Sequence, residues 1–256
     1  LALRRLDGRG APPTEAEQRI LRAWSGWGGV DFAKIPRDPE ILTDDYLRAF
    51  DAWDALREGK SGSTEDASLL QGVVNQFFTP MWVVRAMWRL AMRAMPATGY
   101  KAALEPSAGS GRFLEGAPAT VADAEWCVVE WDRLGAQVLR HSYARSNVHV
   151  FEAPFEGFVA GALPKKVAWD LIIANPPYPA RLSSTMSLDP SFGQYAQAHT
   201  YFTARCASLL RPGGVLVILT PLGQIHSEGV APTELRSLRR YMGRTCQLLG
   251  AYALPV

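Results

Sequence analysis

The chain has 256 residues and a net charge of +2 at pH 7, with 48% of its residues hydrophobic and 20% charged. This composition is ordinary for a soluble globular protein, and the length allows one α/β core with an accessory layer. No apolar run approaches the roughly 20 residues of a membrane span. Wide cysteine spacing excludes a disulfide framework and favours a reducing cytoplasm: Cys127, Cys206 and Cys246. The four histidines show no ligand spacing, so no metal site is predicted.

The first 74 residues are predicted to form a helical extension. Residues 14–17 have the capping-box sequence Thr-Glu-Ala-Glu, which begins a helix by satisfying its free backbone N–H groups. This helix is expected to end at a glycine turn, residues 26–29, and to carry three apolar residues on one side: Ile20, Leu21 and Trp24. Two more helices are expected, one from Thr43 to about Glu58 and one from residue 63 or 64 toward Val74. The extension has tryptophans expected to be core anchors: Trp24, Trp27 and Trp53.

Residues 75–256 are predicted to form a second unit, in which strands alternate with helices. Thr79 is expected to cap an amphipathic helix that begins at Pro80 and reaches about Met95. Helices are also expected near Leu134–Tyr143 and Ala198–Leu210. The predicted strands are Ala102–Leu104, Trp126–Val129, Val148–Phe151, Leu171–Ala174, Val215–Leu219 and Leu248–Ala253. Because helices separate the strands, the sequence predicts a doubly wound, mostly parallel α/β sheet.

A glycine-containing loop follows the first predicted strand. Gly109 and Gly111 allow a tight turn and a close backbone approach to a ligand at the carboxyl end of that strand. The third glycine of a dinucleotide-binding fingerprint would fall at position 114, which is Leu114. A nicotinamide or flavin cofactor is therefore disfavoured.

Carboxylates end the next two predicted strands. Glu130 closes the second strand, where a carboxylate accepts hydrogen bonds from the ribose hydroxyls of a nucleoside cofactor. Glu152 closes the third strand, where a carboxylate would accept from the adenine amine of the same cofactor, although Asp or Asn is more usual there. Together with the glycine loop, these positions favour a nucleoside-containing cofactor.

The fourth predicted strand runs directly into Asn175-Pro176-Pro177-Tyr178. The fixed φ angles of two prolines hold a carbonyl and the asparagine amide in one orientation. Two such acceptors take both protons of a planar NH2 group and direct its nitrogen lone pair at an electrophile. The tyrosine supplies a stacking face for a base extruded from its helix.

In this order, the motifs resemble those of Rossmann-like amino-methyltransferases, in particular the gamma-class N6-adenine DNA methyltransferases. The resemblance covers roughly residues 75–225 and implies S-adenosylmethionine as cofactor. It implies that the tetrapeptide at 175–178 holds the N6 amine of a flipped adenine in DNA for direct attack on the methyl group. The residues that it places at the cofactor are Phe78, Thr79, Pro80, Glu105, Pro106, Ala108, Gly109, Gly111, Glu130, Trp131 and Glu152.

The chain also departs from that family. The chain begins with Leu1 rather than methionine and stops at Val256 at a predicted strand, so we expect it to be a piece of a larger protein. No antiparallel seventh strand and no target-recognition domain are visible, so DNA specificity is expected to come from another domain or subunit, or to be absent. Residues 24–29 resemble the region upstream of the methylase in large phage and plasmid proteins that join a methylase to a helicase. The segment from Pro179 to His199, with Phe192 and Tyr195, is predicted to be a lid or substrate loop.

Other functions remain open from the sequence. The tetrapeptide fits a base amine in RNA or a glutamine side chain in a protein, because all present a similar NH2 group. A non-catalytic cofactor-binding or DNA-binding module of a defence or mobile-element complex is the other alternative. Arginines near both ends of the chain form faces able to neutralise phosphates, or solvated surfaces: Arg4, Arg5, Arg9, Arg236, Arg239, Arg240 and Arg244.

Overall fold

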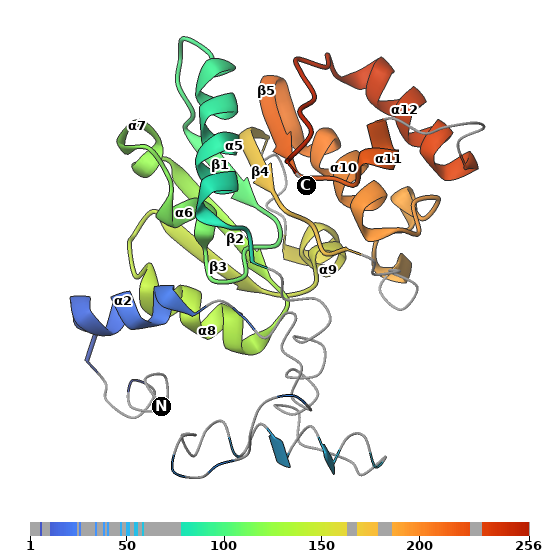
Figure 1. Cartoon of the computed structure of the whole chain (residues 1–256). Helices are drawn as coiled ribbons and strands as arrows, with labels where there is room; N and C mark the ends of the chain where they lie inside the picture. Colours follow the sequence, from blue (N-terminus) through green and yellow to red (C-terminus); the bar gives the residue numbers. More distant parts are fainter. Residues whose placement is uncertain are drawn as a thin grey trace.

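The computed structural model describes residues 11–24, 78–162, 168–178, 186–225 and 232–255, with single residues before position 78: Leu6, Gly26, Lys34, Asp38, Glu40, Leu47, Phe50, Asp51, Asp54, Ala55 and Glu58. In these ranges five strands form one parallel sheet in the order β3-β2-β1-β4-β5 (Figure 1). The strands are β1 (Ala102–Glu105), β2 (Glu125–Glu130), β3 (Val148–Glu152), β4 (Trp169–Ala174) and β5 (Leu210–Ile218). The predicted doubly wound α/β fold is confirmed.

The order of the strands creates a switch point between β1 and β4. From β1 the chain adds β2 and β3 on one side, then returns to place β4 on the other side of β1 and β5 beyond it. Ala103 pairs with Leu171 and Leu104 pairs with Ile172, so the carboxyl ends of β1 and β4 lie side by side. Open α/β sheets bind ligands at such a point, outside the carboxyl ends of the strands.

Helices cover both faces of the sheet, because the side chains of its central strands alternate between two buried clusters. On β4, Leu171 and Ile173 belong to one cluster and Ile172 belongs to the other. The first face is covered by α5 (Met81–Arg93), α6 (Arg112–Glu115), α7 (Ala119–Ala122) and α8 (Arg133–Ser142). The second is covered by α9 (Phe155–Gly157), the π-helix Phe158–Ala162, α10 (Ala198–Leu209) and α12 (Thr233–Thr245). Figure 1 shows α5 (teal) and α10 (orange) separated by the strands.

Short helices and one N-terminal helix complete the described ranges. Two 3-10 helices, Met186–Leu188 and Pro190–Phe192, precede α10, and α11 (Leu222–Ile225) follows β5. The N-terminal helix α2 (Glu15–Ala23) packs on α8. No helix in the described part of the chain is long and apolar enough to cross a membrane.

The N-terminal expectations are confirmed in part. The capping box of α2 is present, since Glu17 N donates to Thr14 Oγ1 and Thr14 N donates to Glu17 Oε2. Leu21 is buried, but Ile20 is 62% exposed, because only the side of α2 that carries Leu21 and Trp24 packs against the domain. Trp27, Trp53, most of the second predicted helix and the whole of the third lie outside the described residues. The division at residue 74 stays a prediction.

The predicted cap of one helix and the predicted sixth strand are wrong. Helix α5 begins at Met81 with Pro80 at its N-cap, so Thr79 does not cap it. Residues 246–255, which include the predicted sixth strand, have no regular secondary structure, and Leu248 and Tyr252 are 71% and 67% exposed. An apolar pattern favours a strand by packing on neighbours, and no described strand pairs with this segment.

Candidate active site

The predicted motifs converge at the carboxyl ends of β1, β2 and β4. The glycine loop, residues 105–111, begins at the last residue of β1, Glu130 ends β2 and Asn175 follows β4 directly. These strands are neighbours in the order β2-β1-β4, so residues up to 70 positions apart in the chain are held at one edge of the sheet (Figure 1). This edge contains the switch point.

Backbone conformation and packing both require the two glycines of the loop. Gly109 has a φ of 55° and Gly111 has a φ of 80°, a left-handed region that other residues rarely adopt. A Cβ at Gly109 would lie 2.6 Å from Cε1 of Phe78, and a Cβ at Gly111 would lie 2.6 Å from Cε2 of Tyr143. Each glycine therefore lies directly under an aromatic ring.

Glu130 connects the end of β2 to the glycine loop. Its Oε2 accepts from Gly109 N at 2.6 Å, and its Oε1 accepts from Asp132 N at 2.8 Å. Burial raises the pKa of Glu130 to about 7, although the hydrogen bonds from Asp132 and Gly109 act in the opposite direction. The neighbouring Trp131 is 56% exposed. A titratable carboxylate and an accessible indole ring thus lie beside the loop.

Two buried polar atoms of the loop region lack a hydrogen-bond partner among the described residues. Glu105 is 1% exposed, and its carboxyl group receives the backbone N–H groups of Phe113 and Leu114, but its Oε2 has no partner. Burial, and next the charge of Glu130, raise the pKa of Glu105 well above its usual value. The hydroxyl of Ser110 is the second such atom. Pro106 and Ala108 lie within the same loop, with Ala108 N donating to Val129 O at 2.9 Å.

The tetrapeptide after β4 is bound to two distant parts of the chain. Asn175 Nδ2 donates to Thr79 Oγ1 at 3.0 Å, and Ser107 Oγ donates to Asn175 O at 2.9 Å. Asn175 Oδ1 is buried and has no partner among the described residues. Pro176 is buried and Pro177 is half-buried. An oriented acceptor is therefore left free on Asn175.

The structure shows the surroundings of Tyr178 and of the two aromatic residues of the predicted lid. The Tyr178 hydroxyl is buried without a partner in the described chain, and this burial raises its pKa. Tyr195 is 1% exposed, and Phe192 lies 6.2 Å from it in ring-to-ring distance, within the second core cluster. The expectation that these two rings serve on a lid is wrong, because Tyr195 is buried and Phe192, in the 3-10 helix Pro190–Phe192, packs edge-on against Tyr201 of α10 and Tyr241 of α12. Residues 179–185 lie outside the described ranges, so a lid or substrate loop there stays a prediction.

Two other sequence candidates already have structural contacts. Glu152 pairs in register with Glu130 at the same sheet edge, but its Oε2 lies 2.9 Å from Arg140 Nη1, so its cofactor role stays a prediction. On α12, Arg239 donates to the carbonyls of Gln224 and Gly223 at 2.9 and 3.0 Å. Those bonds hold α11 and remove one arginine from the proposed phosphate-binding face; the N-terminal arginines lie outside the described residues.

The sequence did not indicate the roles of Thr79 and Ser107 in orienting Asn175. These hydrogen bonds span 96 and 68 residues, and no local sequence pattern indicates them.

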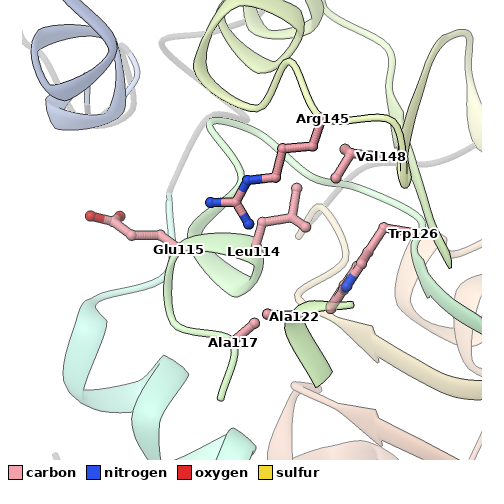
Figure 2. Close-up of a pocket in the computed structure, with 7 residues that line it drawn as sticks. All are labelled: Leu114, Glu115, Ala117, Ala122, Trp126, Arg145 and Val148. Atoms are coloured by element: carbon pink, nitrogen blue, oxygen red, sulfur yellow. The ribbon is translucent and has the colours of Figure 1, made fainter. Parts of the chain in front are cut away.

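A separate pocket of about 170 Å³ lies around α6, with Arg145 directed beside Leu114 while Glu115 points away (Figure 2). That pocket shares no residue with the site. No cluster of metal-ligating side chains occurs in the ranges that the structure describes.

Similarity to known proteins is low in sequence and clear in fold. No family model matches the chain. The defense against restriction protein B of Escherichia phage P1 is 25% identical over 218 residues, which are 81% of this chain and 9% of that protein. A type I restriction-modification methyltransferase subunit from Streptococcus thermophilus matches with a TM-score of 0.53 at 19% identity, covering 80% of this chain and 44% of that one.

Two further solved structures have a similar fold. A protein from Vibrio vulnificus, assigned as the modification subunit of a type I restriction enzyme, matches with a TM-score of 0.51 at 19% identity, covering 88% of this chain and 54% of that one. A protein from Listeria monocytogenes assigned to the class I S-adenosylmethionine-dependent methyltransferases has a TM-score of 0.50 at 14% identity, covering 83% and 68%. The chain spans about half the length of the two restriction-modification subunits. It has the Rossmann-like fold of the class I S-adenosylmethionine-dependent methyltransferases.

Proposed function

We propose that this chain is an S-adenosylmethionine-dependent methyltransferase that acts on the exocyclic N6 amine of adenine in DNA. The observation that carries the proposal is the free, buried Oδ1 of Asn175 at the switch point. The residue is held there because its Nδ2 donates to Thr79 Oγ1 and its backbone carbonyl accepts from Ser107 Oγ. A buried acceptor without a partner costs on the order of 1–3 kcal/mol, so its presence in a rigid setting favours a donor supplied by a ligand.

The residues at the glycine loop fit a nucleoside cofactor with a charged amino-acid part. Glu130 offers a carboxylate where ribose hydroxyls would donate, and the exposed ring of Trp131 offers a face for the adenine. The unpartnered Glu105 Oε2 and Ser110 hydroxyl leave polar capacity near the loop for further ligand groups. When bound, S-adenosylmethionine supplies an electrophilic methyl group on a sulfonium centre. Phe78, Thr79 and Pro80 would border the methionine end.

The tetrapeptide then orients the amine. Asn175 Oδ1 and the Pro176 carbonyl accept one N–H each, which draws the nitrogen lone pair out of conjugation with the base. With the cofactor bound, methyl transfer to this nitrogen would form a C–N bond as the C–S bond breaks, and one amine proton would leave to solvent. Tyr178 would stack on the flipped base. Positioning supplies most of the rate acceleration, because the leaving group is already good.

DNA is favoured over other amine-bearing substrates by the relatives. Two of the structures with this fold are modification subunits of type I restriction systems, and the phage P1 relative is named for defence against restriction. By the same reasoning, we propose that target recognition is supplied by a further domain or subunit, as the designation "subunit" implies for those two proteins. A location in the cytoplasm follows from this proposed DNA substrate.

The test is transfer of labelled methyl groups to unmethylated genomic DNA, followed by identification of the product nucleoside, with Asn175→Ala as the control. N6-methyladenine that disappears in the control supports the proposal. Labelled RNA or labelled glutamine in protein, with unlabelled DNA, would assign the same chemistry to another substrate. Cofactor binding without transfer to any of the three, with native partners present, would indicate a non-catalytic module.

A further inference from the structure

We propose that the C-terminal end of the N-terminal helix α2 is part of the cofactor site, because Arg22 in its last turn and its C-cap residue Trp24 hold both aromatic rings that cover the glycine loop. The inference rests on the proposed function for the identity of the ligand. The contacts that support it are all between residues of this chain and do not depend on that identity. It assigns positioning roles to Arg22 and Trp24, which do not themselves belong to the loop.

The first step is the contact of each ring with one glycine. The ring of Phe78 lies over Gly109, where an added Cβ would approach it to 2.6 Å. The ring of Tyr143, from the end of α8, lies over Gly111 at the same distance. The Tyr143 hydroxyl also donates to Gly111 O at 2.9 Å. Both left-handed residues of the loop are therefore fixed from one side by an aromatic ring.

The second step is the contact of α2 with each ring. Trp24 packs edge-on against Phe78, with ring centroids 5.2 Å apart and an interplanar angle of 82°. The guanidinium of Arg22 lies over the ring of Tyr143, 5.9 Å from its centroid. Both geometries are favourable, one as an edge-to-face aromatic pair and the other as a cation–π contact. Two residues at the C-terminal end of α2 thus reach the two rings.

The third step is the attachment of α2 itself. Leu21 is buried in a cluster with Leu6 and with Val138 of α8, and the capping box fixes the start of the helix. Trp24 N donates to Leu21 O at 3.1 Å, which fixes the end. Because α2 is anchored on α8, its two side chains hold the rings in place rather than follow them.

The consequence is preorganisation of the loop. Glu130 accepts from Gly109 N on one hand, and the rings cover the glycines on the other, so the loop backbone has its ligand-binding shape before a ligand arrives. Loss of the Trp24 contact would release Phe78 and allow Gly109 to leave its left-handed conformation. Cofactor binding would then carry the cost of ordering the loop again.

The experiment compares Trp24→Ala with the parent protein, using Ile20→Ala as the matched control on the exposed side of the same helix. The readouts are amide hydrogen exchange of residues 109–112 without ligand, and the Kd of S-adenosylhomocysteine by calorimetry. We expect faster exchange confined to the loop and binding about three- to tenfold weaker for Trp24→Ala. Trp24→Phe should restore both, and Ile20→Ala should match the parent.

A second pair tests the route through each ring. Trp24→Ala should have little added effect on loop exchange in a Phe78→Leu background, since the ring through which it acts is already gone. Arg22→Ala should increase exchange at Gly111, whereas Arg19→Ala, on the exposed surface of α2, should not. Unchanged loop exchange in Trp24→Ala, or equal changes in Ile20→Ala, would overturn the inference. Failure of the parent protein to bind the cofactor analogue would instead refute the proposed function, while the exchange data would still test α2.

Discussion

The side-chain amide of Asn175 donates to the hydroxyl of Thr79 at 3.0 Å, and this bond decides which atom of Asn175 is free. An asparagine side chain has one acceptor oxygen and one donor NH2 group. With the NH2 group engaged by Thr79, the oxygen is the atom left without a partner in the described chain. The amine of the proposed substrate is a donor, so the contact with Thr79 leaves the matching acceptor of Asn175 available.

Removal of the Asn175 amide is expected to lower turnover strongly while cofactor binding persists. Asn175→Ala should lower kcat about 10²- to 10³-fold, the loss seen when one oriented polar group at a reacting centre is removed. Single-turnover methyl transfer and calorimetric cofactor binding would be measured on the same samples. A variant that lost cofactor affinity and activity in parallel would place Asn175 in the cofactor site instead.

A substitution at Thr79 tests the orientation of the Asn175 side-chain amide while the amide itself is kept. Thr79→Val keeps the shape but removes the acceptor, so the Asn175 amide can rotate and expose its NH2 group to the amine. We expect kcat to fall about three- to tenfold, equivalent to one net hydrogen bond, with Thr79→Ser close to the parent. The cofactor Kd should change less than kcat; a larger change in Kd would mean that Thr79 acts mainly on the cofactor.

The pKa of Glu130 predicts a pH dependence of stability. Burial raises this pKa from 4.5 to about 7, so the folded protein keeps a proton that the unfolded chain releases in this interval. The contribution of Glu130 to the free energy of unfolding is therefore complete below about pH 4.5 and is lost as the pH rises through 7. Denaturant titrations between about pH 5 and 8 should show a flatter profile for Glu130→Gln than for the parent. Glu105 contributes to both curves, so parallel profiles would contradict the assignment to Glu130.

The conformation of Gly109 predicts that even a methyl side chain at this position lowers stability. Gly109→Ala places a methyl group 2.6 Å from the Phe78 ring at a φ of 55°. We expect the free energy of unfolding to fall by about 1–3 kcal/mol and cofactor affinity to decrease. Adding Phe78→Leu to the Gly109→Ala variant should recover the part of this loss that comes from the contact with the ring, and leave the part that comes from the backbone conformation. Gly161→Ala, where an added Cβ meets nothing within 4 Å, is the control.

Much of the fold was predictable because its signals are local. Five of the six predicted strands are present, each within a few residues of the expected ends except β5, which begins earlier, at Leu210. The fully buried run of β4 and its direct passage into Asn175 depend only on neighbouring residues. The prediction of a sixth strand was wrong because a strand needs a partner, and the apolar residues 248–254 carry no information about whether one is present. The prediction that Ile20 packs with Leu21 and Trp24 was wrong for a similar reason, since periodicity does not show how wide a face of α2 is covered by the rest of the domain.

The sequence by itself therefore determined the parallel α/β architecture, the glycine loop and the position of the Asn-Pro-Pro-Tyr tetrapeptide after a buried strand. Only the tertiary structure decided that Thr79 and Ser107 hold Asn175, that Glu130 holds Gly109, and that Trp24 and Arg22 reach the rings above the loop. The reason is physical. Backbone conformation follows from short-range sterics and hydrophobic periodicity, whereas the partner of a side chain depends on which distant segments the sheet order brings to the same edge.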